Sequence, residues 1–248
     1  MKTTIKIKEK LRVIDLTKPL DISLPLKSGR SNPMAWYQEA PSIQPVKEKK
    51  WIAKVTEGAA INFNRIQFAP HAHGTHTECV GHITPEFYSV NDCLKHYFFL
   101  AEVITLVPED YMGDRVFSKK QLEHRMQEES PEALVIRTLP NTRSKRTKKY
   151  DHTNWPYFLE EAALWLRECG IKHLLVDLPS IDREEDHGQL LAHRAFWNYP
   201  EAPRMESTIT ELIYVPARVK DGLYILNLQL APFHNNASPS KPVLYSIQ

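Results

Sequence analysis

Apolar and polar positions along the chain predict many short strands. Almost wholly apolar runs are typical of buried strands, and alternation of apolar with polar residues is typical of half-buried strands. Runs of these two kinds occupy residues 5–16, 61–68, 100–107, 133–138 and 171–180 and the segments LYILNLQLA and KPVLYSI. Gly58 lies near a turn between two strand-like runs in residues 51–68. Frequent proline (18) and scarce glycine (8) favour short elements joined by loops.

Two segments have the signals of helices. Residues 118–128 begin with Ser118 and Gln121, which are spaced as in a capping box. Residues 158–169 place their apolar side chains on one face, and Gly170 ends that helix. The strand, helix and strand within residues 133–178 predict a βαβ-like unit. The sequence therefore predicts a mixed α/β fold, in one domain that spans residues 1–248.

Composition narrows the class of protein. Hydrophobic residues make up 42% of the 248 and charged residues 25%, values typical of a soluble globular protein. The net charge of +2 is too balanced to indicate nucleic acid or a membrane surface as a partner. No apolar run approaches the ~20 residues of a membrane span, and the N-terminus lacks the apolar core of a signal peptide. The three cysteines form no CxxC motif, so we expect free thiols and a cytoplasmic location.

Residues 70–82, PHAHGTHTECVGH, gather four of the 11 histidines with one glutamate. Zinc and manganese take imidazole nitrogen and carboxylate oxygen as ligands. His76 and Glu78 are two residues apart, so on an extended backbone both side chains point toward one ion. Either His71 or His73 can come round from the preceding turn, and His82 is close enough to reach the same centre. A zinc site with one open position activates water, so hydrolysis is the reaction class that the cluster favours.

Two other stretches bear on chemistry. Glu211 lies inside the apolar run TELIYV, and a carboxylate on a buried strand needs a partner, which a metal would supply. Residues 143–149, RSKRTKK, form a basic loop that we interpret as solvated surface; binding of an anionic group is the alternative. His193, considered alone, is a histidine on the face of a helix.

Five segments in order resemble the metal-dependent cyclase family. The segment from Gly74-Thr75 through His76-x-Glu78 to His82 resembles its HxGTHxDxPxH signature. The other four are IDLTKPL, LLVDLPSID, LAHRAFW and NNASPSKPVL, so the resemblance covers most of the chain. The family includes bacterial kynurenine formamidase (arylformamidase) and isatin hydrolase.

The resemblance implies a swivelling β/β/α fold, a homodimer or homotetramer, and a site for one or two divalent ions, zinc or manganese. It implies that His76 is a metal ligand and that Glu78 stands for the aspartate that bridges two ions. His82 matches the family's proton-transferring histidine. His193 and Glu211 match the downstream metal ligands, and Trp36 corresponds to an aromatic residue that packs on the substrate.

The sequence departs from the signature at three points. The first histidine should stand four residues before His76, where this chain has Ala72; we favour His71 as its replacement over His73. Glu78 replaces aspartate, and its extra methylene moves the carboxylate by about 1.5 Å. Val80 and Gly81 replace a Pro-x pair, and the stretch between His193 and Glu211 is longer than in the family.

Three functions agree with these features. The first is an amide hydrolase of the arylformamidase type that acts on a small molecule such as N-formyl-L-kynurenine. The second is a hydrolase or cyclase of the same family that acts on another cyclic amide or ester. The third is a catalytically silent metal-binding homologue, in which the altered first histidine and the change to Glu78 have removed activity.

Overall fold

The computed structural model describes residues 1–7, 9–127 and 131–248. Its centre is one sheet of eight strands, in the spatial order β16-β9-β12-β14-β15-β8-β17-β3. In chain order these strands are β3 (Leu20–Asp21), β8 (His76–Cys79), β9 (Phe98–Leu106), β12 (Ala133–Thr138), β14 (His173–Val176), β15 (Thr208–Glu211), β16 (Gly222–Leu230) and β17 (Ala237–Ser246). Strand β16 also pairs with β17, which closes seven strands into a barrel and leaves β3 attached to β17. The predicted mixed α/β fold is confirmed.

The predicted βαβ unit is present. Strands β12 and β14 are parallel neighbours, and α3 (Glu160–Glu168) lies between them in the chain. The helix begins two residues later than residue 158, because β13 (Tyr157–Phe158) pairs with β11 (Asp114–Phe117) instead. Gly170 follows the helix with a φ of 80°, a left-handed conformation that glycine adopts without strain.

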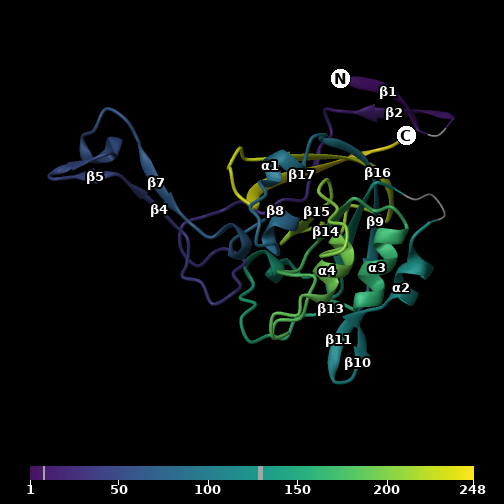
Figure 1. The fold of residues 1–248 in the computed structure, drawn as a ribbon. Helices are drawn as coiled ribbons and strands as arrows, with labels where there is room; N and C mark the ends of the chain where they lie inside the picture. The colour runs from purple at the N-terminus through teal and green to yellow at the C-terminus, as the bar shows by residue number, and fades with distance from the viewer. Residues whose placement is uncertain (8, 128–130) are drawn as a thin grey trace.

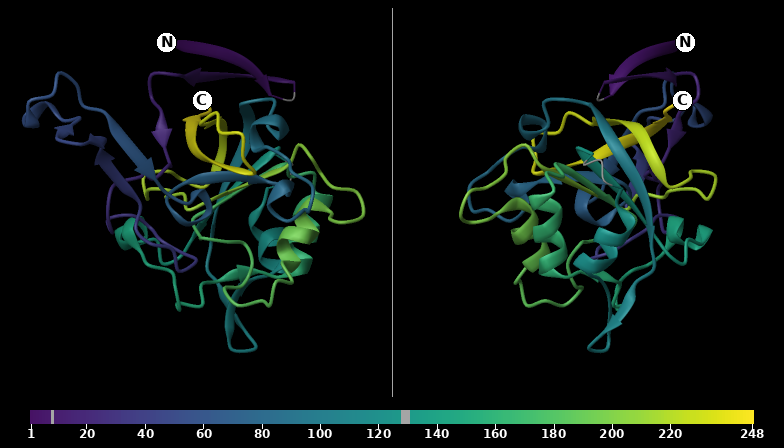
Figure 2. Two further views of the ribbon diagram at one scale, coloured as in Figure 1. Left: turned by 60° about the vertical axis from the view of Figure 1, so that its left-hand side comes forward. Right: turned by 90° about the vertical axis from the view of Figure 1, so that its right-hand side faces the viewer.

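Helices α2 (Lys119–Arg125), α3 and α4 (Leu191–Trp197) lie on the same side of the barrel (Figures 1 and 2). The capping box predicted at Ser118 and Gln121 is present at the start of α2. The helix ends at Arg125, earlier than predicted, because Met126 has an extended backbone; the predicted last residue, 128, lies outside the described residues. Side chains of β12 alternate: Leu134 and Ile136 pack with the helices, whereas Ala133 and Val135 pack in a second apolar cluster. Apolar clusters thus cover both faces of β12, which explains why residues 133–136 are all apolar.

The remaining elements lie around the barrel. The hairpin of β1 (Lys2–Ile7) and β2 (Lys10–Asp15) lies near the C-terminus, where Ile14 forms a bridge to Ile247. Strand β10 (Glu109–Tyr111) pairs with β11, and α1 (Val90–Cys93) packs on β8. The structure describes no helix that is long and apolar enough to cross a bilayer.

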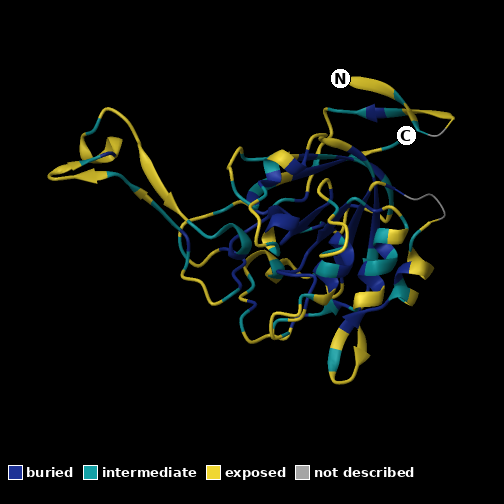
Figure 3. Cartoon of the chain, in the orientation of Figure 1, coloured by how far each residue is buried: buried dark blue, intermediate teal, exposed yellow. Residues whose placement is uncertain are grey.

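A long arm projects from the barrel and is mostly exposed (Figures 1 and 3). It consists of β4 (Ser42–Pro45) paired with β7 (Asn64–Gln67), β5 (Lys47–Glu48) paired with β6 (Trp51–Ile52), and the 3-10 turn η1 (Val55–Glu57). The segment INFNRIQF, predicted as a strand that leads into the histidine cluster, therefore contributes only four strand residues, and these belong to the arm. The strand that carries the cluster is β8 itself.

Candidate metal centre

His76 and Glu78 share one face of β8, because side chains two residues apart on a strand point the same way. Strand β15 runs antiparallel to β8 and places Glu211 directly opposite His76. Glu211 Oε2 lies 3.4 Å from His76 Nε2. All three side chains are buried. Two neighbouring strands thus fix one imidazole and two carboxylates on the same side of the sheet.

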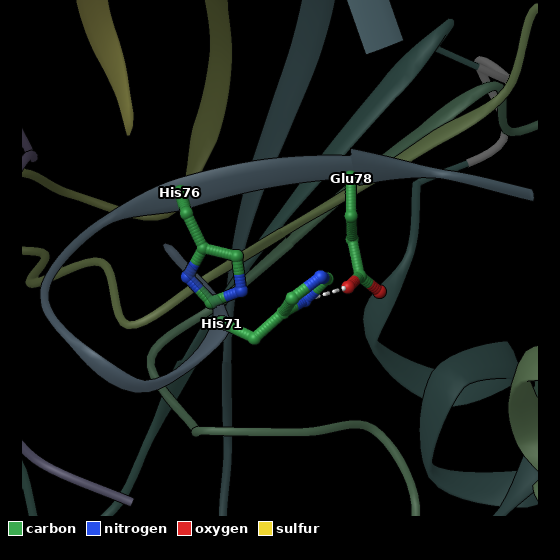
Figure 4. A group of neighbouring side chains, drawn as sticks. All are labelled: His71, His76 and Glu78. Atoms are coloured by element: carbon green, nitrogen blue, oxygen red, sulfur yellow. Dashed lines mark ion pairs between the residues drawn. The ribbon is translucent and has the colours of Figure 1, made fainter. Parts of the chain in front are cut away.

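His71 approaches this group from the turn before β8. The 3-10 turn η2 (Pro70–Ala72) carries it, and Gly74, with a φ of 75°, lets the chain reverse into the strand. His71 Nδ1 lies 2.8 Å from Glu78 Oε2. Figure 4 shows His76 and Glu78 extending from one strand toward the His71 ring. His73 is held elsewhere, because its Nδ1 accepts a hydrogen bond from the Ala69 backbone N–H at 3.0 Å.

His82 enters from the other end of β8, on the 3-10 turn η3 (Val80–His82). Its ring stacks on His71 with a centroid separation of 4.1 Å, and its Nε2 lies 3.8 Å from Glu78 Oε2. Gly81 is needed in this turn, because a Cβ there would lie 2.5 Å from the Tyr88 carbonyl oxygen. The His82 side chain is 32% exposed, whereas that of Glu78 is 1% exposed. His82 therefore lies at the boundary between the cluster and solvent.

His193 completes the cluster from α4. Its Nε2 lies 3.1 Å from Glu78 Oε1 and 3.9 Å from Glu211 Oε1. Its Nδ1 is hydrogen-bonded to Asp182, which also accepts the backbone N–H groups of Ala192 and His193. When Nδ1 donates to this carboxylate in the neutral ring, Nε2 carries the lone pair and faces the cluster. Asp182 thus fixes both the start of α4 and the orientation of the imidazole.

Protonation in this cluster is set by burial and by neighbouring charge. Burial lowers the pKa of His76 to about 4, so the ring is neutral at pH 7. Burial raises the pKa of Glu211 well above its usual value, and the nearby Glu78 raises it further. Burial opposes ionisation of Glu78 as well, but His82, His193 and His71 outweigh it and hold that pKa well below its usual value. For His193, the carboxylates of Asp182 and Glu78 outweigh burial and raise its pKa.

Four buried atoms of the cluster have no hydrogen-bond partner among the described residues. They are His71 Nδ1, His76 Nε2, Glu78 Oε2 and Glu211 Oε1. The close approach of His71 to Glu78 does not have the angles of a hydrogen bond. Buried polar atoms are rarely left without partners, and these are imidazole nitrogens and carboxylate oxygens that converge on one space. This donor set fits a divalent cation.

Two overlapping groups of donor atoms are close enough for a shared ion. One consists of His71, His76 and Glu78, and the other of Glu78, His82 and His193. Glu78 belongs to both groups, so the arrangement offers places for one or two ions. His82 therefore has two candidate roles, as a ligand and as a proton-transferring group.

A pocket of about 450 Å³ opens onto the cluster. Its walls include Trp36, His71, His82, His193 and Glu211. Trp36 has a φ of 62°, and the edge-to-face contact of its ring with Trp155, at a centroid separation of 5.1 Å, holds it at the pocket. A small molecule in this pocket would lie within reach of Trp36 and of the cluster.

Comparison with known proteins identifies the family. A family model described as "Putative cyclase" matches residues 14–183. The chain belongs to the cyclase family. Kynurenine formamidases of Bacillus thuringiensis (strain Al Hakam) and of Bacillus cereus are 26% identical to this chain over 230 residues, which are 92% of this chain and 97% of each relative.

Solved structures have the same fold. Isatin hydrolase A from Labrenzia aggregata, bound to benzyl benzoate, superposes with a TM-score of 0.67 at 13% identity, and the match covers 93% of this chain and 94% of that structure's chain. A structure described as "Potential Metal-Dependent Hydrolase With Cyclase Activity" gives a TM-score of 0.65 at 18% identity, with 92% and 97% covered. The family and fold expected from the sequence are thereby confirmed.

The structure brings six residues that were expected from the sequence into one cluster. They are His71, His76, Glu78, His82, His193 and Glu211. Trp36 lines the adjoining pocket. The alternative first ligand, His73, lies outside the cluster.

Two residues that orient ligand candidates were not predicted from the sequence. Asp182 holds His193, and Asn236 Oδ1 lies 3.1 Å from His71 Nε2. Both stand in segments that resemble the family, Asp182 at the end of LLVDLPSID and Asn236 in NNASPSKPVL. The signal was therefore present, but a role in holding another side chain depends on proximity that the sequence does not display.

Proposed function

We propose that this member of the cyclase family is a metal-dependent amide hydrolase that resembles arylformamidase and acts on an aryl formamide such as N-formyl-L-kynurenine. The observation that carries the proposal is the convergence of four buried nitrogen and oxygen atoms, which have no hydrogen-bond partner among the described residues, beside a pocket lined by Trp36. The 26% identity to kynurenine formamidases over 92% of the chain supports this substrate class.

His71, His76, Glu78, His193 and Glu211 would hold zinc or manganese, as one or two ions. A cation bound there supplies a Lewis acid that polarises the substrate carbonyl and lowers the pKa of water. Asp182 would hold the neutral, ligating form of His193 with its Nε2 lone pair directed at the centre. Burial of Glu78 and Glu211 excludes water from their carboxylates and strengthens their attraction for a cation.

His82 is placed to move the proton. Its Nε2 faces the Glu78 carboxylate, and its partly exposed ring borders the pocket. Burial lowers its pKa, so the ring is neutral and able to accept a proton from the attacking water. The same nitrogen would return that proton to the leaving amine as formate departs. Trp36 would pack on the aryl ring and orient the formamide toward the cluster.

The test pairs elemental analysis with hydrolysis of N-formylkynurenine, before and after chelation. Stoichiometric metal with turnover that chelation abolishes and metal restores is the expected result. Isatin serves as a second substrate: metal-dependent turnover of isatin alone would assign the chain to a cyclic amide instead. A His187→Ala variant, altered at an exposed histidine outside the cluster, is the matched control and should retain activity. Metal without turnover of either substrate would favour the silent homologue, and absence of metal after reconstitution would reject the metal centre.

A further inference from the structure

A second cavity, of about 760 Å³, lies outside the metal centre and shares none of its lining residues. Three segments form its walls, at residues 21–25, 143–146 and 214–218. Three arginines, Arg143, Arg146 and Arg218, are among its lining residues. We propose that this cavity binds a small molecule that carries two or more phosphate or carboxylate groups.

Arg143 and Arg146, the two arginines of the basic loop at residues 143–149, lie on the same side of that loop. They lie three residues apart in the 3-10 turn η4 (Arg143–Thr147), where side chains at positions i and i+3 eclipse. Arg218 approaches from the loop that follows β15 and lines the same cavity. Two loops far apart in the sequence therefore direct three guanidinium groups into one space.

Within the described residues, no ion pair or side-chain hydrogen bond is formed by Arg143, Arg146 or Arg218; Arg146 only stacks over the Tyr214 ring, at 5.8 Å. The single carboxylate in the wall, Asp21, is already paired with Lys241 and accepts hydrogen bonds from Ser23. The cavity therefore has an excess of positive charge, which an anion would neutralise.

Buried cations hold both loops in place. Lys145 does not line the cavity. Its Nζ donates to the Thr138 carbonyl at 2.6 Å and pairs with the buried Asp177 at 2.8 Å. Arg137 donates to the carbonyls of Pro216 and Val219 at 3.3 and 2.7 Å and so fixes the loop of Arg218. The arginines are thus presented from anchored backbones, which lowers the entropy lost when an anion binds.

The chemistry of the wall defines the ligand class. Guanidinium groups bind phosphate and carboxylate oxygens in a planar, bidentate manner, and these charge-assisted hydrogen bonds are strong. The cavity is larger than a single phosphate requires, and three guanidiniums match a ligand with several anionic groups. Organic phosphates and polycarboxylates share this chemistry, so the experiment includes one of each.

The experiment is isothermal titration calorimetry on the full chain with fructose 1,6-bisphosphate and, separately, propane-1,2,3-tricarboxylate. Both are weak metal chelators, which limits interference from the metal centre. The matched variants are R146Q/R218Q, which removes two cavity charges, and K220Q, which removes a neighbouring exposed charge that does not line the cavity. Melting temperatures of all variants verify folding.

We expect at least one probe to bind, and its affinity to fall about tenfold or more in R146Q/R218Q while K220Q stays within about twofold of the parent. Affinity should also fall as salt is raised, because exposed charges are screened. Preference for the bisphosphate would indicate that the cavity binds organic phosphates, and preference for the tricarboxylate would indicate that it binds polycarboxylates. Equal affinity in the parent and R146Q/R218Q, or no binding heat with either probe at about 5 mM, would overturn the proposal.

Discussion

Asp182 accepts a hydrogen bond from His193 Nδ1 and, with the same carboxylate, the backbone N–H groups of Ala192 and His193. One side chain thus fixes the start of α4 and the orientation of a ligand candidate. In Asp182→Asn we expect metal affinity to fall about 10- to 100-fold, since partners that orient ligands tune the centre. We also expect the metal-free protein to lose about 1–3 kcal/mol of stability, because the amide nitrogen that replaces one carboxylate oxygen leaves buried donors without an acceptor.

Zinc competition and thermal melting measure these two effects separately. Glu185→Gln is the control, because Glu185 is exposed in the same loop. Unchanged zinc affinity in Asp182→Asn would show that His193 is either not a ligand or oriented without its carboxylate partner.

His82→Ala separates the two candidate roles of His82. If the ring transfers protons, turnover should fall about 10²- to 10⁴-fold while metal content stays near that of the parent. Its position at the solvent boundary, 3.8 Å from the Glu78 carboxylate, supports this expectation. Elemental analysis beside kinetics distinguishes the roles: a parallel loss of metal would make His82 a ligand, as the group of Glu78, His82 and His193 also allows.

Glu211→Gln should have opposite effects on the metal-free and metal-loaded protein. Glu211 and Glu78 bury two carboxylates in one cluster, and without a cation this arrangement is unfavourable. We therefore expect the metal-free variant to melt at a higher temperature than the parent, and the rise in melting temperature on adding zinc to be smaller. Glu132→Gln, at a half-exposed position, should change neither value. A lower melting temperature in the metal-free variant would contradict this account.

Lys145→Met should be strongly destabilising. Lys145 is 11% exposed and Asp177 is fully buried, so removing the ammonium leaves an unpaired charge in the interior. We expect a loss of about 3–5 kcal/mol in the free energy of unfolding, measured by urea denaturation. Lys172→Met is the comparison, because its partner Glu132 is 51% exposed, and it should cost at most about 1 kcal/mol. Equal losses of stability in the two variants would show that burial of the ion pair does not determine the cost of breaking it.

Local sequence patterns predicted the positions of many strands and helices correctly. The apolar run at 133–138 is strand β12, and the Ser118 capping box starts α2. The start of α3 was missed by two residues, because Tyr157 and Phe158 pair with β11, some forty residues earlier in the chain. Such pairing depends on contacts that no local pattern displays. The expected single domain, the homodimer or homotetramer and the cytoplasmic location stay predictions.

The sequence by itself determined the donor chemistry of the candidate centre: histidines and a glutamate at strand spacing, a second glutamate in an apolar run, and the segments that resemble the cyclase family. Only the tertiary structure decided which donors meet. The turn at Gly74 brings His71 to Glu78 and holds His73 apart, and the pairing of β8 with β15 sets Glu211 opposite His76. The tertiary structure likewise decided that Asp182 meets His193 and that Arg143, Arg146 and Arg218 line one cavity. Residue type fixes what a side chain can bind, but proximity arises from sheet closure and buried anchors that join distant segments.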